Sequence, residues 1–201
     1  MVSVFPITYF GNIQYYRQLL RAVCPIIETR EHFIKQTNRT RCEILTSNGV
    51  QQLSIPVMKH NGSKTPLNEV EISQQTAWQK IHWRGIESAY SSAPFFDHYG
   101  MEIEELIFQK EKNLIQFNLN IMYRVDRWLE LNGSYSCSDS YISENIAMDH
   151  RSCDFSQTEP IKKYVQVFEA DADGSFVSNL SILDLIFNEG PLARNWLIEQ
   201  N

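Results

Sequence analysis

The hydrophobic pattern of this chain begins with a β-α-β unit. Residues 2–10 are rich in Val, Phe, Ile and Tyr, which is typical of a buried strand. Asn12 is a good helix N-cap, and the residues after it, IQYYRQLLRA, carry apolar side chains at helical spacing. Residues 24–29, CPIIET, then predict a second strand.

The clearest local pattern is a β-hairpin over residues 42–57, CEILTSNGVQQLSIPV. Two β-rich runs flank the Asn48-Gly49 pair, and Asn-Gly is the preferred pair for a type I′ turn. A polar loop with Gly and Pro follows at residues 59–68. The alternation in residues 68–73, NEVEIS, predicts a further short strand.

From residue 76 onward, hydrophobic residues recur at the spacing of helices. One helix is predicted from residue 76 to the SSAPFF stretch, where Pro94 ends it, and two more at 99–108 and 113–131. A shorter helix near the C-terminus is expected to begin at Asn179 or Ser181 as N-cap and to stop at Gly190.

Residues 132–160 are rich in Ser, Asp and Asn and predict an irregular insertion or lid, while residues 163–168 predict one more strand. The whole pattern indicates a single α+β domain over residues 1–201. It is expected to have one mixed β-sheet, an Asn-Gly β-hairpin and a cluster of helices in the middle and C-terminal parts.

Composition narrows the function classes. The chain has 201 residues, is 43% hydrophobic and 21% charged, and has a net charge of −6, with a pI near 5.4. Such an acidic balance argues against nucleic-acid binding. No stretch is apolar enough for a membrane span, and no secretory signal is evident, so we expect a cytoplasmic protein with its four cysteines reduced.

A basic stretch, KQTNRTR at residues 35–41, stands out in this acidic chain. Lys35, Arg39 and Arg41 supply positive charge and Asn38 an amide, a set that suits a phosphate or carboxylate. Because Arg39 and Arg41 are two positions apart at a strand entry, we expect them to point the same way. Alternatively, the stretch is an exposed strand edge whose charges prevent unwanted strand pairing.

His82 lies on the apolar stripe of its predicted helix, one turn after Trp78. An inward histidine can act as a general base near neutral pH. It can equally be a core residue that bonds a backbone carbonyl. No zinc-type spacing supports a metal site at His82 and His98, although such a site remains an alternative.

Asp184 is flanked by apolar residues in SILDLIF, where a charge is unusual unless it meets a cation, and Arg39 or Arg41 would be the natural partner. Polar aromatic residues gather around Asp97-His98, with Tyr90 and Tyr99, and could either stack on a sugar or base or simply cap two helices. The common loops for nucleotide hydrolysis, dinucleotide binding and serine hydrolysis are absent from the sequence, and no cofactor is indicated.

Several of these stretches, in this order, resemble the WbqC-like protein family: YFGNIQYY, KQTNRTRCEI with its NG and LSIPV, WQKIHWRGIESAYSSAPFF, and LSILDLIFNEGP. The resemblance spans Tyr9 to Pro191, and the basic loop looks most like the Bacteroidetes branch. Gly11-Asn12 replaces the Pro-Trp that is usual in the family, so a role for that Trp does not carry over.

The resemblance implies a role in the assembly of surface polysaccharides such as O-antigen, and no settled reaction. It points to a transferase-like enzyme acting on an anionic sugar-nucleotide or acyl-donor molecule. His82 would be the base, with Asp184 or Glu189 orienting it, and the anion would meet Lys35, Asn38, Arg39, Arg41 and Tyr90. The alternative is a non-catalytic binding or scaffold protein that meets a protein partner through the aromatic surface at Phe95, Phe96 and Tyr99.

Overall fold

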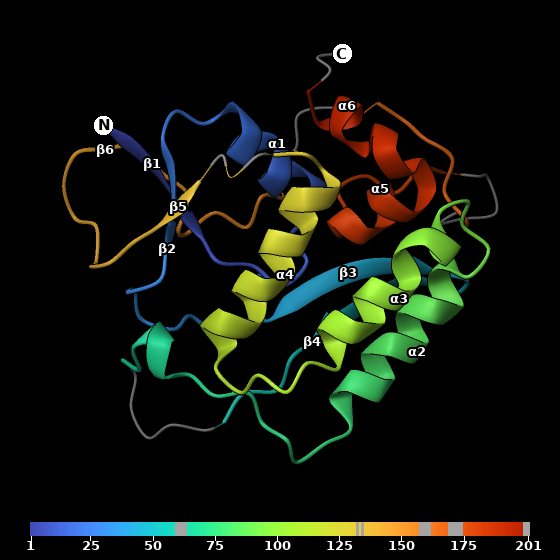
Figure 1. Ribbon diagram of the computed structural model, residues 1–201, viewed down its shortest axis with the longest axis horizontal. Coiled ribbons are helices and arrows are strands. Elements are labelled where there is room, and N and C mark those ends of the chain that lie inside the picture. Colours follow the sequence, from blue (N-terminus) through green and yellow to red (C-terminus); the bar gives the residue numbers. More distant parts are fainter. Residues whose placement is uncertain (59–63, 132, 134, 157–161, 169–174, 199–201) are drawn as a thin grey trace.

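The computed structural model describes the 201-residue chain except residues 59–63, 132, 134, 157–161, 169–174 and 199–201 (Figure 1). Its strands are β1 (Val2–Pro6), β2 (Pro25–Glu28), β3 (Arg41–Thr46), β4 (Gly49–Ser54), β5 (Ser136–Cys137) and β6 (Ile146–Asp149). Its helices are α1 (Ile13–Arg21), α2 (Trp78–Tyr90), α3 (Phe96–Ile107), α4 (Leu114–Trp128), α5 (Ile182–Glu189) and α6 (Ala193–Ile198), and short 3₁₀ helices span Leu67–Glu69 and Gly190–Leu192.

The strands form a parallel sheet and an antiparallel pair. The parallel sheet has the order β5-β2-β1-β6, and β3 pairs with β4 in the hairpin. β1 and β2 are neighbours because α1 returns the chain from the end of β1 to the start of β2. The predicted α+β class, with both parallel and antiparallel pairing, is confirmed, and the two kinds of pairing are divided between two sheets.

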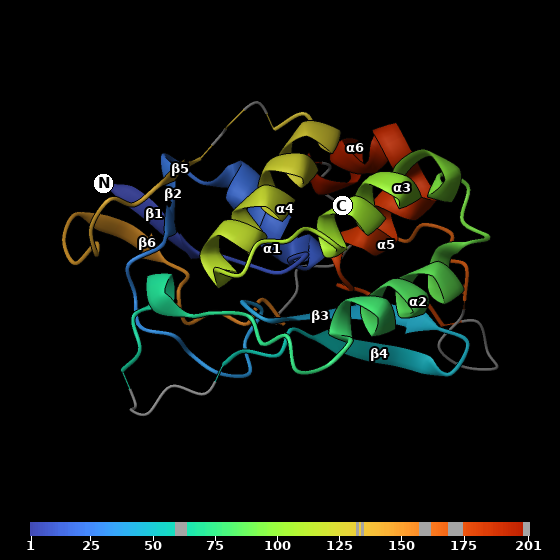
Figure 2. The ribbon, with the colours of Figure 1, turned by 60° about the horizontal axis from the view of Figure 1, so that its bottom comes forward.

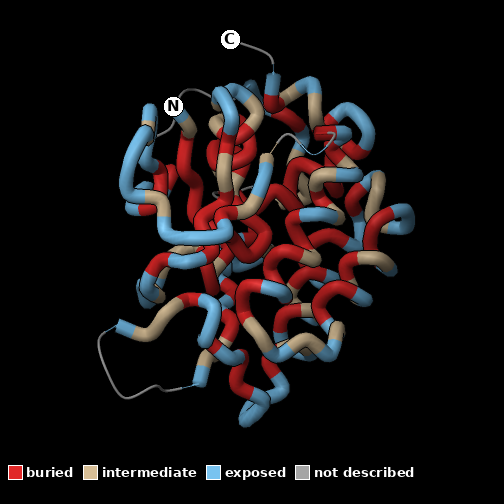
Figure 3. Tube along the Cα trace, turned by 60° about the vertical axis from the view of Figure 1, so that its left-hand side comes forward, coloured by how far each residue is buried: buried red, intermediate tan, exposed pale blue. Residues whose placement is uncertain are grey.

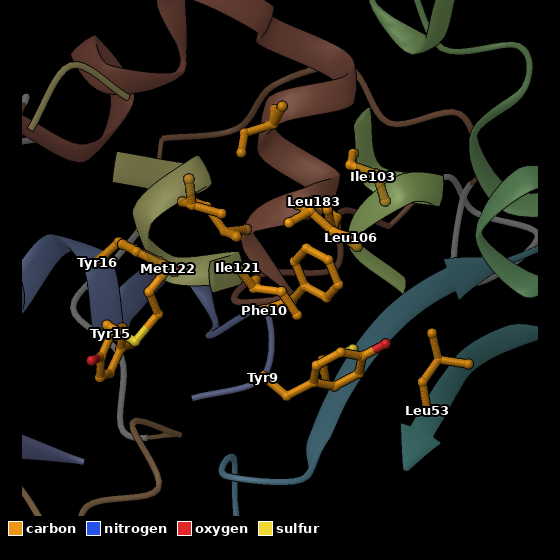
Figure 4. Close-up of a cluster of buried hydrophobic side chains, with 14 of the residues drawn as sticks. Tyr9, Phe10, Tyr15, Tyr16, Leu53, Ile103, Leu106, Ile121, Met122 and Leu183 are labelled. Atoms are coloured by element: carbon orange, nitrogen blue, oxygen red, sulfur yellow. The ribbon is translucent and has the colours of Figure 1, made fainter. Parts of the chain in front are cut away.

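One cluster of buried apolar side chains joins the sheets and the helices. Figure 2 shows α2 running along the hairpin, and Figure 3 shows buried segments through the centre of the molecule with exposed ones outside. Tyr9 and Phe10, in the loop after β1, point into the same cluster as Ile121 and Met122 of α4 and Leu183 of α5 (Figure 4). The core therefore fixes the path of the chain between β1 and α1.

The hairpin forms where it was predicted, with a turn displaced by one residue. Thr46 pairs with Gly49, so Ser47 and Asn48 occupy the turn, and Gly49 follows with a φ of 95°. The Thr46 hydroxyl accepts from the Asn48 N–H at 3.2 Å and donates to the Gly49 carbonyl at 2.9 Å. These bonds stabilise the displaced turn, and the type I′ geometry predicted at Asn48-Gly49 is not adopted.

Two predicted strands are wrong. The 68–73 stretch contains part of a 3₁₀ helix and two isolated bridges, because Val70 and Ile72 are buried in the core without forming a ladder. Residues 163–168, which are all described, form no strand. There the Gln166 side chain bonds both backbone groups of Val177, at 2.9 and 3.0 Å, in place of strand pairing.

The segment 132–160 was predicted to be irregular, and two pieces of it are instead strands. β5 adds to β2, and β6 adds to β1, both in parallel. These strands have two and four residues, which is too few for the alternation of apolar and polar residues that marks a strand in the sequence. They bring the residues after β6 to the end of the parallel sheet.

None of the helices in the described ranges combines the length and the apolar character that crossing a membrane requires.

Gly190 ends α5 as predicted, with a φ of 53°. A Cβ at this position would overlap the Phe95 ring. We therefore expect Gly190→Ala to lower the free energy of unfolding by about 2 kcal/mol, from backbone strain and displacement of the ring. Chemical denaturation would measure the loss. Gly133→Ala is the control, because Gly133 has a φ of 64° and no atom near its missing Cβ. An equal loss in both variants would contradict a role for Phe95.

Candidate functional site

The candidate site lies at the carboxyl ends of β1 and β6. From β1 the chain proceeds to β2 on one side, while β6 lies on the other side of β1. In open parallel sheets, ligands bind outside the carboxyl ends of the strands at such a reversal of strand order. The segments that follow Pro6 and Asp149 therefore border the position where a ligand is expected.

Arg39 ties the basic loop to this end of the sheet. Its side chain is only 2% exposed, and its Nε donates to Glu31 Oε1 at 2.8 Å. Its Nη2 lies 2.6 Å from the same oxygen and donates to the Arg151 carbonyl at 3.0 Å. The Asn118 amide donates to the Arg39 carbonyl at 2.8 Å. Arg39 is thus a structural cation paired with Glu31, and the predicted pairing with Asp184 is wrong.

A second buried ion pair borders the first, and no pattern in the sequence marks its residues. Glu28, at the end of β2, is fully buried and accepts from the Ser138 hydroxyl at 2.7 Å and the Ile142 N–H at 3.0 Å. Arg151 lies 3.5 Å from Glu28 and 2.6 Å from Asp149. Hydrogen bonding to Arg151 lowers the pKa of Asp149. The two pairs fix the loop and the segment after β6 against each other.

A cavity of about 230 Å³, here called the polar cavity, opens beside this network. Its walls come from the loop after β1, the basic loop, the hairpin and two segments near residues 155 and 180. Amide and hydroxyl side chains dominate its lining, which consists of Phe10, Asn12, Gln36, Asn38, Arg41, Cys42, Glu43, Gln52, Asp154, Ser156, Asn179 and Ser181.

The hairpin presents its polar face to this cavity. Arg41 and Glu43 are two residues apart on β3, so their side chains share a face, and Gln52 lies directly opposite Glu43 on β4. Cys42 and Ile44, which alternate with these two residues along β3, are buried. Within the described chain, Arg41 has no hydrogen-bond or ion-pair partner. The guanidinium of Arg41 is therefore available to a ligand, unlike that of Arg39.

A second cavity of about 290 Å³, here called the strand-end cavity, adjoins the polar one. Its lining comes from the end of β1, the basic loop and the segment after β6: Pro6, Ile34, Gln36, Thr37, Asn38, Arg39, Arg151, Ser152, Cys153 and Asp154. The two cavities share Gln36, Asn38 and Asp154. Arg39 and Arg41 thus line different cavities, and the expectation that they point the same way is wrong.

Two helix N-termini meet at the polar cavity, and their N–H groups are already bonded. Asn12 caps α1 by accepting from Tyr15 N–H at 2.9 Å, as predicted. Ser181 caps α5 by accepting from Leu183 N–H at 3.3 Å. Asn179 accepts from the Gln14 N–H at 3.0 Å. The helix ends therefore shape the wall, and the free donors for a ligand are side chains.

Asp184 meets two phenols and an amide instead of the expected cation. Its carboxylate accepts from the Tyr164 hydroxyl at 2.5 Å and from the Gln166 amide at 2.9 Å. Tyr90 interacts with the same carboxylate. Burial raises the pKa of Asp184, and these hydrogen bonds oppose the rise. The structure thus brings Tyr90 to Asp184, and neither residue lines the two cavities.

His82 lies in another part of the molecule. It is 3% exposed, its Nδ1 is 2.9 Å from the Tyr9 hydroxyl, and its ring bonds the backbone of Ser54. Burial lowers its pKa to about 4. His82 lines a separate hollow between β4 and the start of α2. This hollow does not contain Arg39, and neither the polar cavity nor the strand-end cavity contains His82.

The other predicted site residues, Glu189 and Lys35, line neither the polar cavity nor the strand-end cavity. Glu189 accepts from the Trp196 indole N–H at 2.9 Å, and Lys35 is exposed on the basic loop. The structure therefore places Asn38 and Arg41 at the polar cavity. His82, Asp184 and Glu189 lie elsewhere, each with different partners. In the described part of the chain, no group of three or more His, Cys, Asp or Glu side chains is placed to hold a metal ion.

Of the aromatic residues proposed as a partner surface, Tyr99 is buried, and Phe95 and Phe96 are half-buried against the core. Phe96 stacks on Trp83 with ring centroids 6.1 Å apart and also contacts Phe187. Tyr99 is 4% exposed and packs edge-on against Trp128. These rings stabilise the contacts of α3 with its neighbours and offer little surface to a partner.

Comparison with known proteins gives three findings. The model of the WbqC-like protein family matches residues 8–172. The chain is 25% identical over 200 residues to "Uncharacterized protein Rv1507c" of Mycobacterium tuberculosis (strain ATCC 25618 / H37Rv), and the match covers 86% of each chain. No solved structure matches the chain significantly.

Proposed function

The chain belongs to the WbqC-like protein family, and we propose that it binds a small polyhydroxylated molecule carrying an acidic group, such as a sugar phosphate, in the polar cavity. We propose further that it acts as a transferase-like enzyme on this molecule in surface-polysaccharide assembly. The binding proposal is drawn from the polar cavity. The reaction class and the pathway are drawn from the family resemblance.

Backbone strain around the polar cavity is the observation that carries the binding proposal. Phe10, Gln36 and Asn179 line it with φ angles of 41°, 61° and 62°. Phe155, between two lining residues, has a φ of 56°. Each such non-glycine residue costs about 1–3 kcal/mol, and residues of this kind cluster at ligand sites. The clustering of these strained residues at one cavity supports a binding role for the cavity, because the strain lowers stability.

The lining groups indicate the class of ligand. Amides and hydroxyls can both donate and accept, which suits a ligand with several hydroxyl groups. Arg41 can bind a phosphate or carboxylate through two parallel N–H bonds. Lys35 adds positive charge nearby on the same loop. The anion site predicted for the basic loop is thus retained as a proposal. Arg41 and Asn38 would contact the anion, and Arg39 would hold the loop in place through Glu31 and the Arg151 carbonyl.

The proposed transfer also needs a general base at the polar cavity. The predicted base, His82, lines a different hollow, and its nitrogens already have partners. Glu43 and Asp154 are the carboxylates at the polar cavity. A general base must come within about 3 Å of the proton that it accepts. Glu43 and Asp154 lie at the polar cavity, whereas His82 does not.

The proposal is tested by the thermal stability of the purified protein with glucose 1-phosphate, inorganic phosphate and glucose. At about 100 times its dissociation constant, a ligand stabilises the protein by about 2.7 kcal/mol. We expect glucose 1-phosphate to raise the melting temperature. Arg41→Ala should weaken this binding at least about tenfold, because a charged hydrogen-bond donor contributes about 1.5–3 kcal/mol.

Arg84→Ala is the matched control, because Arg84 is an exposed arginine of α2 that does not line the polar cavity. It should bind glucose 1-phosphate as the wild type does. An unchanged melting temperature with all three compounds, or equal weakening in both arginine variants, would show that the polar cavity is not the site.

A further inference from the structure

The strand-end cavity is the second hollow at this end of the sheet, and its position is that of a ligand site. Pro6 is the last residue of β1, and Arg151 follows the end of β6, so the cavity lies at the reversal of strand order. Crevices at this position bind ligands in open parallel sheets. Nothing in the proposed function assigns an occupant to this cavity.

The two arginines of the cavity are already neutralised, and the Asp154 carboxylate accepts hydrogen bonds from the Ser156 N–H and hydroxyl. Arg39 is paired with Glu31 at 2.6 Å, and Arg151 with Asp149 at 2.6 Å. A charged ligand would have to break one of these pairs, and a buried charge left without its partner is costly. An uncharged ligand leaves both pairs in place.

Most of the accessible surface of the wall is apolar, and the uncharged polar side chains that also line it are Gln36, Thr37, Asn38 and Ser152. Pro6 and Ile34 contribute carbon atoms, and Cys153 a thiol, from separate lining segments of the hollow. Ile34 is 43% exposed although it is a large apolar residue. An apolar group that enters here would cover this side chain and remove its surface from water.

The two cavities are neighbours across a thin partition. Gln36, Asn38 and Asp154 line both, and the Asn38 amide donates to the Asp154 carbonyl at 3.2 Å. Ligands in the two cavities would therefore be separated by single side chains.

We propose that the strand-end cavity binds an uncharged, largely apolar group, such as a short acyl chain, beside the polar ligand. The proposal rests on the proposed function of the polar cavity only for what lies next to it. Binding of an apolar group in the strand-end cavity depends on Ile34, Pro6 and the two neutralised arginines, Arg39 and Arg151.

The test uses Cys153 as a reporter, because its thiol lines the cavity and is exposed. The full chain is alkylated with N-ethylmaleimide, with and without hexanamide, a neutral apolar probe, and the rate at each cysteine is followed by mass spectrometry. At about ten times its dissociation constant, hexanamide should slow alkylation of Cys153 about tenfold. Cys24 is also exposed and lines neither cavity, so its rate should stay unchanged.

Two variants separate the cavities. Ile34→Trp fills the strand-end cavity from an exposed position, and should abolish protection by hexanamide while glucose 1-phosphate still binds. Arg41→Ala should weaken the binding of glucose 1-phosphate, while hexanamide still protects Cys153. Absence of protection in the wild type, or protection that persists in Ile34→Trp, would overturn the proposal. Protection by hexanamide without any binding of glucose 1-phosphate would uphold the apolar site and refute the polar one.

Discussion

Replacing Arg39 by alanine is expected to lower the free energy of unfolding by about 3–5 kcal/mol, because it leaves Glu31 buried without a cation. Both side chains of this pair are nearly inaccessible, at 2% and 6% exposed. Burial raises the pKa of Glu31, and Arg39 opposes the rise. Arg39 also donates to the Arg151 carbonyl, so the variant loses an anchor between the basic loop and the segment after β6.

The loss should depend on pH in a defined direction. Without Arg39, the folded-state pKa of Glu31 rises further above its unfolded value. The folded variant then binds more protons than the unfolded chain, and its stability falls as the pH rises through that window. Urea denaturation at several pH values would measure this. The deficit relative to wild type should be smaller in mild acid than at neutral pH.

Two further variants identify the ion pair as the cause. Arg41→Ala removes an unpaired arginine of the same loop, and should change stability by no more than about 0.5 kcal/mol. The double variant Glu31→Leu/Arg39→Met should be more stable than Arg39→Ala, because no unpaired charge remains buried. A loss of less than about 1 kcal/mol in Arg39→Ala would contradict the structural role, and would return Arg39 to the set of free ligand-binding residues.

The helices and the hairpin could be predicted from the sequence because they are local. Asn12 caps α1 through a bond to Tyr15, three residues on, and α2 has its buried residues at helical spacing. β5 and β6 were missed because each is short and pairs with a strand more than a hundred residues away. Nothing in a stretch such as IAMD marks it as the neighbour of β1.

The site was half predictable for the same reason. The basic loop was recognised by its composition, and it does line both cavities. Which of its arginines is free depends on Glu31, Arg151 and Asn118, and only the fold brings these together. Asp154 and Asn179 reach the polar cavity from remote segments with no pattern that marks them. His82 and Asp184 were singled out because each is a polar residue among apolar neighbours in the sequence, and each has its partners in the core.

His82 itself is expected to make the protein sensitive to acid. Burial is the main cause that lowers its folded-state pKa from 6.5 to about 4. Above about pH 6.5 the ring is neutral in both states and has no effect on the pH dependence. Below that value the unfolded chain takes up a proton that the folded one refuses. Stability should therefore fall by about 1.4 kcal/mol per pH unit, and by about 3 kcal/mol in all at pH 4.

The comparison that isolates this effect is the pH dependence of urea denaturation in wild type and His82→Gln. The substituted glutamine cannot titrate, so the curve of the variant should be flatter between pH 6.5 and 4. His150 also has a lowered pKa, but it is present in both proteins, so its contribution cancels in the difference. Parallel curves would contradict the buried neutral ring. A general base would instead show as a loss of turnover of about 10²–10⁴-fold in the folded variant, and a side chain with a pKa of about 4 and hydrogen bonds to Tyr9 and Ser54 is poorly matched to that role at neutral pH.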